Sequence, residues 1–167
     1  MLMNNVLIGL KISLPTLMCL MFVLFGSSIY SLTPFYQIPM PFVLSVIFYF
    51  SVFHPAILNV FCVFCIGIFA DLIETSPFGL NTFFYVLIFF CGNIHRRFFL
   101  NLKFNDFWLS YALVLAGVLL LWYIFCIIAT LTIMPFLPVL FQYAVLVFTY
   151  PAIAWLCGYL NLKIGGL

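Results

Sequence analysis

Long apolar runs follow one another along almost the whole chain, and only short stretches of polar, charged or proline residues separate them. A helix of about 20 apolar residues crosses the hydrocarbon core of a bilayer, which is about 30 Å thick. The pattern therefore predicts an all-α integral membrane protein, a six-helix transmembrane bundle that forms a single domain over residues 1–167. The predicted spans are residues 12–32, 35–53, 56–73, 78–94, 107–134 and 139–160.

The boundary between the second and third spans is the least distinct, because only His54 and Pro55 separate the two runs. A single helix over residues 42–70 would be about 43 Å long at about 1.5 Å per residue, which exceeds the hydrocarbon core unless the helix tilts steeply. We therefore predict two spans joined by a tight turn. Pro55 would then stand at the start of the third span, where its missing N–H costs little.

Composition supports the membrane prediction, and charge orients it. Hydrophobic residues make up 68% of the chain, charged residues make up 5%, and the mean hydropathy is +1.38. Basic residues in short loops tend to remain cytoplasmic. If the protein is a multi-pass protein of the bacterial inner membrane with both termini in the cytoplasm, the rule holds for Lys11, Arg96, Arg97, Lys103 and Lys163. A five-span alternative with the N-terminus outside misplaces only Lys11 and stays open.

The segment GIFADLIETSPFGLN, residues 67–81, contains two of the three acidic residues, Asp71 and Glu74. A carboxylate at a helix C-terminus meets the negative end of the helix dipole, and charge is costly near hydrocarbon. A compensating partner follows directly, because Ser76 can cap a helix and Pro77 suits its first position. We expect a helical hairpin that holds both carboxylates near the free N–H groups of the fourth span. The simpler alternative is that the two acids only mark a loop boundary and help to set topology.

Small residues indicate faces where helices can approach one another closely. Gly67 lies four residues before Asp71 on the same helix face, and Gly79 lies early in the next span. Amides and hydroxyls within the spans, such as Asn81 and Thr82, are expected to hydrogen-bond between helices. The last two spans carry further small residues that serve packing within the bundle or contact with another protein, namely Ala112, Ala116, Gly117, Ala154 and Gly158.

The one basic cluster consists of Arg96, Arg97 and Lys103, and aromatic residues flank it. This pattern is typical of a loop anchored at the anionic cytoplasmic leaflet, where each basic residue contributes about 1 kcal/mol. The alternative is a docking surface for a cytosolic partner.

The sequence contains no pattern that is typical of catalysis. Intramembrane hydrolysis needs a nucleophile with a base, two facing carboxylates or a metal-binding motif. In the six-span arrangement Asp106 lies across the membrane from Asp71, so these two residues cannot form a dyad. The spans also offer no ionisable group near the midplane for a charged solute. We therefore expect no enzyme activity, no metal, no cofactor and no nucleic-acid partner.

The run from Tyr49 to Tyr85, YFSVFHPAILNVFCVFCIGIFADLIETSPFGLNTFFY, resembles the central signature of the MreD family of rod shape-determining membrane proteins. That signature has a proline at the head of one span, then a Gly-x-x-x-Asp pair followed by leucine, and after a short turn a glycine with leucine or valine. One departure is Glu74-Thr75, where family members often have Ser-Gly. The matching positions are Pro55, Gly67, Asp71, Leu72, Gly79 and Leu80.

The resemblance implies a non-enzymatic scaffold subunit of the bacterial cell-elongation complex, which takes part in cell shape and peptidoglycan synthesis. The partners it implies are the bitopic protein MreC, the actin-like MreB, the RodA glycosyltransferase and a penicillin-binding transpeptidase, together with membrane lipids. MreD proteins are also similar in fold to the S-components of energy-coupling-factor transporters. The alternative function is therefore a small-solute-binding S-type subunit of such a transporter.

Overall fold

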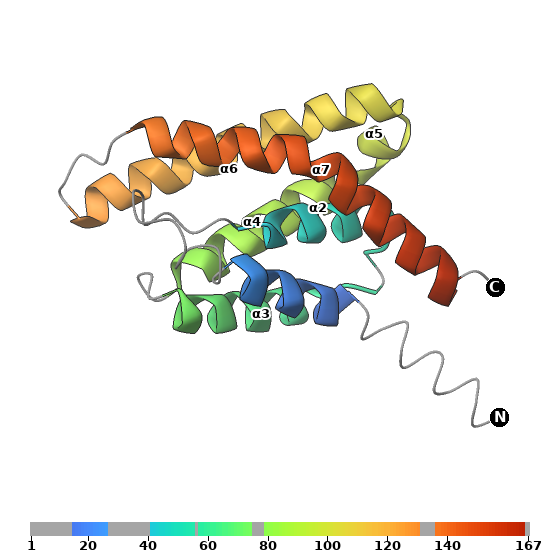
Figure 1. Ribbon diagram of the computed structural model, residues 1–167, viewed down its shortest axis with the longest axis horizontal. Coiled ribbons are helices and arrows are strands. Elements are labelled where there is room, and N and C mark those ends of the chain that lie inside the picture. The colour runs from blue at the N-terminus through green and yellow to red at the C-terminus, as the bar shows by residue number, and fades with distance from the viewer. Residues whose placement is uncertain (1–14, 27–40, 56, 75–78, 131–135, 166–167) are drawn as a thin grey trace.

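The computed structural model describes residues 15–26, 41–55, 57–74, 79–130 and 136–165, and all regular structure in this part of the chain is helical. A first helix, Pro15–Gly26, precedes six labelled helices (Figure 1). These are α2 (Val43–Phe53), α3 (Val60–Ile73), α4 (Leu80–Ile94), α5 (Arg96–Leu100), α6 (Phe104–Thr130) and α7 (Phe136–Gly165).

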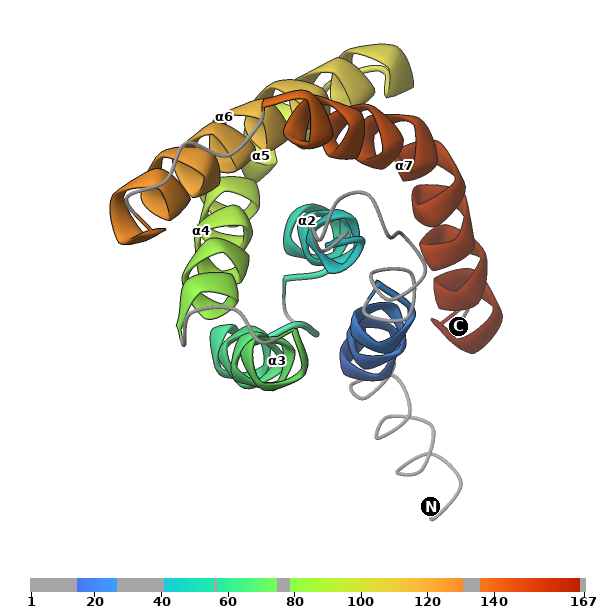
Figure 2. The same cartoon turned by 60° about the vertical axis from the view of Figure 1, so that its left-hand side comes forward.

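Helix α2 lies at the centre of the molecule. The first helix, α3, α4 and the α6–α7 pair surround it (Figure 2). Nine of its eleven residues are buried, and the two serines among them, Ser45 and Ser51, hydrogen-bond to Tyr111 and to the carbonyl oxygen of Phe48. A helix that is apolar all round is expected in such a position, because every face contacts other helices.

Each of the six predicted spans overlaps one described helix, although the boundaries differ. Two helices, Asn105–Ile128 within α6 and Phe136–Leu160 within α7, are long and apolar enough to cross a membrane. The other four apolar helices have between 10 and 17 residues. Helix α2, for example, is about 16 Å long at about 1.5 Å per residue, well short of a bilayer core of about 30 Å. The number of complete membrane crossings stays a prediction.

Two local predictions are wrong. Pro55 does not open a helix, because α3 begins only at Val60, after an extended Asn59, and the carbonyl oxygen of His54 instead accepts the N–H groups of Ile57 and Leu58. The connection between α2 and α3 is therefore longer than a tight turn.

The basic segment after α4 is also more ordered than a simple loop, because it contains the short helix α5. Phe99 of α5 is buried, and its ring packs 5.4 Å from that of Phe48 and 6.1 Å from that of Phe107. This aromatic contact holds α5 against the middle of α2 and the start of α6.

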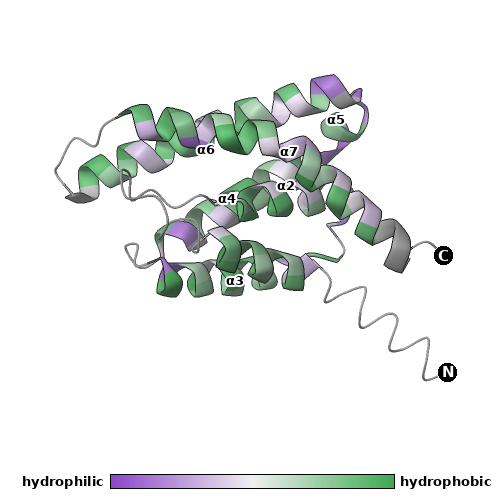
Figure 3. Ribbon diagram, viewed as in Figure 1, coloured by the Kyte–Doolittle hydropathy of each residue, from purple (hydrophilic) through white to green (hydrophobic). Residues whose placement is uncertain are grey.

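Large apolar side chains cover the outside of the described helices. The exposed fractions reach 71% for Phe61 in α3, 74% for Leu113 in α6 and 75% for Phe148 in α7. Polar residues gather instead around α5 and the start of α6, and where α3 meets α4 (Figure 3). A water-soluble monomer rarely exposes so much apolar surface, so this distribution fits a protein whose sides face lipid.

Helix α7 changes direction about halfway along its length (Figures 1 and 2), and Pro151 lies inside it. Proline has no N–H to donate to the carbonyl oxygen four residues earlier, and its ring bends the helix. That carbonyl belongs to Val147, and the indole Nε1–H of Trp108 in α6 donates to it at 2.9 Å. The hydrogen bond lost to proline is thus replaced by one that joins α6 to α7.

A close helix contact joins α3 to α4 at Gly67. A β-carbon on Gly67 would lie only 2.5 Å from the Cα atom of Thr82 and 2.9 Å from its Oγ1 atom. The close approach expected from this glycine is therefore present. By contrast, a β-carbon on Gly117 would meet no atom within 4 Å, so Gly117 makes no comparable contact among the described residues.

We predict that Gly67→Ala destabilises the protein and that Gly117→Ala does not. The new methyl group at position 67 meets backbone of α4, which can yield only if the two helices move apart, and overpacking of this kind costs about 1–3 kcal/mol. Thermal unfolding of the two purified variants in detergent measures the difference. Equal melting temperatures for both variants would contradict the contact.

Candidate functional site

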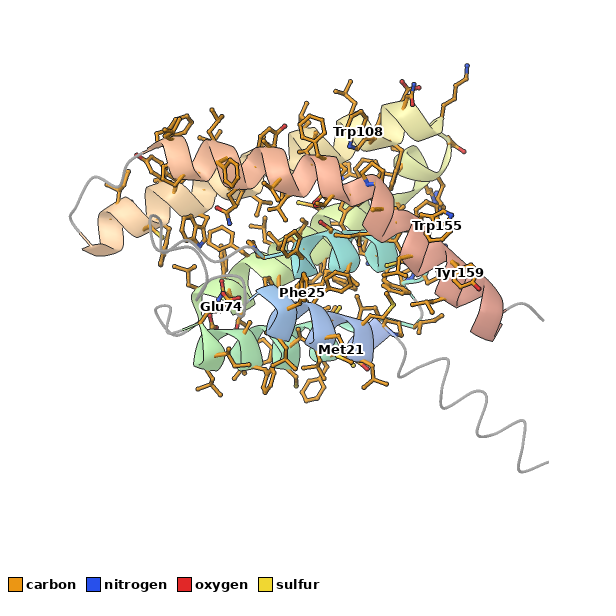
Figure 4. The ribbon with its side chains drawn as sticks, in the orientation of Figure 1. Met21, Phe25, Glu74, Trp108, Trp155 and Tyr159 are labelled. Carbon is orange, nitrogen blue, oxygen red and sulfur yellow. The ribbon has the colours of Figure 1, made fainter. Side chains whose placement is uncertain are left out.

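Asp71 and Glu74 lie at the C-terminal end of α3, beside the start of α4. Their side chains are 3% and 8% exposed. Figure 4 labels Glu74 where the ends of these two helices meet. Burial of two acidic residues at one helix end requires specific hydrogen-bond donors, because a buried carboxylate without partners is very unfavourable.

The first turn of α4 supplies those donors to Asp71. Its Oδ1 atom accepts the N–H of Asn81 at 2.8 Å. Its Oδ2 atom accepts the N–H of Gly79 at 3.0 Å, the N–H of Thr82 at 3.3 Å and the Thr82 hydroxyl at 2.7 Å. A helix start leaves four N–H groups without partners in the helix, and the carboxylate takes three of them. Asp71 therefore caps α4 from a neighbouring helix, and its negative charge lies at the positive end of the α4 dipole.

Gly79 makes this geometry possible through its backbone. Its φ angle is +92°, a left-handed conformation that other L-residues rarely adopt, and it is the residue directly before α4. The prediction that Gly79 provides close helix packing is wrong, because a β-carbon there would meet no atom of the described residues within 4 Å.

The prediction that the fourth span starts with a cap at Ser76 and a first position at Pro77 is also wrong, because α4 begins at Leu80 after the N-cap residue Gly79. Residues 75–78 themselves lie outside the described part of the chain. The helix begins later than predicted because the cap comes from Asp71, eight or more residues earlier in the sequence.

Glu74 is the C-cap residue of α3, and its Oε2 atom accepts a hydrogen bond from the side-chain amide of Asn81 at 2.9 Å. Asn81 thus bridges the two acids, with its backbone N–H on Asp71 and its side chain on Glu74. Burial raises the pKa of Glu74 to about 7, the Asn81 hydrogen bond opposes this shift, and the charge of Asp71 adds to it. Glu74 marks a helix boundary, but it is also part of the buried cluster.

We call Asp71, Glu74, Gly79, Asn81 and Thr82 the carboxylate cluster. The donors around Asp71 occupy both of its oxygen atoms, so the cluster is suited to joining two helices. Within the described residues, no group of three or more His, Cys, Asp or Glu side chains could hold a metal ion. A cavity of about 20 Å³ beside Asn81 and Tyr85 has room for about one water molecule.

The other family-pattern residues surround this cluster or lie apart from it. Leu80 is 4% exposed and packs with Phe84 of α4 and Val118 of α6. Leu72 is 65% exposed and faces outward. Pro55 lies in the connection before α3, at the far end of that helix.

The basic residues lie at the opposite end of α4, about 22 Å from the carboxylate cluster along a helix of 15 residues. Arg96 donates from Nε to the carbonyl oxygen of Val52 at 2.7 Å, while Arg97 and Lys103 are exposed. Burial and the Arg96 charge lower the pKa of His54 at the same end. Asp106, in the first turn of α6, also belongs to this end, so it lies far from Asp71.

The predicted small-residue faces differ in their surroundings. Ala112 is buried, and its carbonyl oxygen accepts the Tyr143 hydroxyl at 3.2 Å. Gly158 faces α2, because a β-carbon there would lie 3.4 Å from the Tyr49 hydroxyl. Two open grooves contain the remaining alanines: Ala116 lines one between α6 and α7, and Ala154 lines one between α2, α6 and α7.

The expected hairpin is present, because Asp71 accepts free N–H groups at the start of α4. The expected hydrogen bonds between helices at Asn81 and Thr82 are also present, but the sequence did not indicate that these two residues would be the donors to the acids. The available signal was their position ten and eleven residues after Asp71, directly across a short hairpin connection. The aromatic group around Phe48, with Tyr111 stacked on Tyr150 at 3.8 Å, was also missed, because apolar spans rich in aromatic residues give no pairing signal.

Comparison with known proteins gives one family. A family model described as rod shape-determining protein MreD matches residues 10–161, nearly the whole chain. No curated protein and no solved structure matches significantly.

We predict that Asp71→Asn lowers stability more than Asp106→Asn does. The amide keeps the shape of the carboxylate but places an NH₂ group against N–H donors, and each donor left without an acceptor costs about 1–3 kcal/mol. Asp106 is exposed, so its substitution is the matched control. Unfolding temperatures in detergent measure both effects, and a melting temperature for Asp71→Asn equal to that of the control would rule out the cap.

The raised pKa of Glu74 predicts a pH dependence of stability. A carboxyl group whose pKa is higher in the folded state binds its proton more tightly there, so its contribution is complete below about pH 4.5 and is lost as the pH rises through about 7. We expect the wild-type protein to lose stability between pH 5 and pH 8.

Glu74→Gln keeps an oxygen acceptor for Asn81 and removes the titration, so the loss of stability between pH 5 and pH 8 should become smaller in this variant. Asp106→Asn should leave it unchanged. An identical pH profile for wild type and Glu74→Gln would contradict the prediction.

Proposed function

The chain belongs to the MreD family of rod shape-determining membrane proteins, and from this we propose that it is a non-enzymatic membrane scaffold of the bacterial cell-elongation complex. The single observation that carries the proposal is the family match over residues 10–161. In this function the protein maintains rod shape by holding wall-synthesis proteins together in the inner membrane.

Two features of the described residues support a scaffold that performs no chemistry. Hydrogen bonds from α4 already occupy the carboxylate oxygens of Asp71, and both acids of the carboxylate cluster are nearly inaccessible to solvent. General acid–base catalysis needs a titratable group within reach of a substrate. The buried pair is better suited to a fixed helix hairpin.

The proposed partners are MreC as the direct contact, with MreB, RodA and a penicillin-binding transpeptidase in the same complex. The lipid-facing sides of α6 and α7 offer apolar surface for a partner's membrane helix. The basic end, with Arg97 and Lys103 exposed, offers charge to the anionic leaflet or to a cytosolic partner.

The proposed topology has six spans and both termini in the cytoplasm. It is supported by the positions of the charged residues, because the acids of the carboxylate cluster and the basic residues after α4 lie at opposite ends of α4. The start of the first helix and the end of α7 lie at the same end of the molecule as α5 (Figure 1).

The alternative, an S-type transporter subunit, needs a roomy pocket with converging polar groups. Among the described residues, the cavity near Asn81, Tyr85 and Gln142 measures only about 20 Å³, and two larger grooves are lined by apolar and aromatic residues. These dimensions favour the scaffold.

The proposal is tested by depletion and complementation in the rod-shaped host. We expect depletion to convert rods into rounded cells, and we expect Asp106→Asn to restore rods. Asp71→Leu should restore rods poorly, because the apolar side chain leaves the first N–H groups of α4 without acceptors. In this variant either the membrane level of the protein or its co-purification with partners should fall.

Co-purification from native membranes distinguishes the two functions. Recovery of a single-span protein and wall synthases supports the scaffold, whereas recovery of transport ATPases supports the transporter. Rod shape that persists without the protein would refute the proposal. Normal shape and normal partner recovery with Asp71→Leu would show that the carboxylate cluster is not needed for this function.

A further inference from the structure

A lateral groove opens between α2, α6 and α7, near the basic end of the molecule. Its volume is about 360 Å³, which is at the lower end of the range for small-molecule sites. The groove is lined by Tyr49, Phe53, Phe107, Pro151, Ala154 and Trp155. We call it the aromatic groove.

The bend of α7 at Pro151 shapes this groove, because Pro151, Ala154 and Trp155 all lie at or after the bend. Trp155 is 71% exposed and stacks on Tyr159 at 5.7 Å between ring centroids (Figure 4). Phe53 and Phe107 form the opposite wall, with their rings 5.4 Å apart. Tryptophan and tyrosine side chains such as Trp155 and Tyr159 gather where hydrocarbon meets lipid headgroups.

Positive charge lies next to the wall that Phe53 and Phe107 form. Arg96 donates to the carbonyl oxygen of Val52, the residue before Phe53. The carbonyl oxygen of Lys103 accepts the N–H of Phe107, which places Lys103 one helical turn before that ring. With Arg97, this end carries three cations against one described carboxylate, Asp106.

We propose that the aromatic groove and the adjacent cations form a binding site for one anionic phospholipid. An acyl chain lies in the groove against Phe53, Phe107 and Trp155, and the phosphate headgroup lies against Arg96 and Lys103. Basic pockets beside membrane helices at the cytoplasmic side bind anionic headgroups in this manner. The site requires the protein to be in a membrane, but it does not depend on a role in cell elongation.

A phospholipid fits this groove better than a partner's helix does. The groove joins an apolar lining to a cluster of cations within one helical turn, and a phospholipid joins its acyl chains to an anionic phosphate over a similar distance. An apolar partner helix would match the lining of the groove but would offer no negative charge to Arg96 and Lys103.

The test uses the purified full-length chain in detergent and native mass spectrometry. Phosphatidylglycerol and phosphatidylcholine with identical acyl chains are added in equal amounts. We expect several-fold greater retention of phosphatidylglycerol. Arg96→Gln combined with Lys103→Gln should reduce its retention to that of phosphatidylcholine.

A matched pair of variants locates the site. Ala154→Leu fills the aromatic groove and should remove most of the retained phosphatidylglycerol. Ala116→Leu fills the separate groove between α6 and α7, which has a volume of about 200 Å³, and should leave retention unchanged. If Ala154→Leu fails to fold, the double variant Arg96→Gln and Lys103→Gln and the comparison of the two lipids still test whether the protein binds an anionic phospholipid.

Three results would overturn the proposal. One is equal retention of the two lipids by the wild-type protein, and another is unchanged retention of phosphatidylglycerol in a folded Ala154→Leu variant. The third is that Ala154→Leu loses a co-purifying membrane protein and keeps its lipid, which would identify the groove as a protein docking site.

Discussion

The capping of α4 by the Asp71 carboxylate is the interaction on which the rest of the structure depends. A helix start and a charged side chain are each unfavourable in an apolar environment, and here each satisfies the other. The pairing fixes where α4 begins and holds it against α3, while the contact between Gly67 and Thr82 sets their separation. Because α4 then runs from the carboxylate cluster to Arg96, the same contact also determines where the basic end lies.

Much of the site could be predicted from the sequence because charge is so rare in this chain. The chain has only three acidic residues, and Asp71 lies four residues after Gly67 and shortly before α4. Few groups could therefore partner its carboxylate, and the free N–H groups of α4 were the nearest. Gly67 could be assigned to a close helix contact for a similar reason, since a glycine inside an apolar helix usually permits an approach that a side chain would prevent.

The remaining details depend on tertiary contacts that no local pattern encodes. Ser76 and Pro77 have the residue types of a helix start, yet the cap of α4 comes from another helix and from the left-handed backbone of Gly79. Pro55 likewise suits the first turn of a helix, but the turn formed by His54 precedes α3 instead. Helix α5 exists because Phe99 can reach the rings of Phe48 and Phe107, which come from two helices that are distant in the sequence. Propensity alone could not indicate any of these contacts.

The burial of α2 has a consequence for how the protein is made. This helix is about 16 Å long and nearly all of its surface contacts other helices, so a bilayer alone is a poor match for it. During synthesis α2 emerges before α4, α6 and α7, the helices that later enclose it. We therefore expect the stable integration of α2 to require the later helices, so that several segments enter the membrane together.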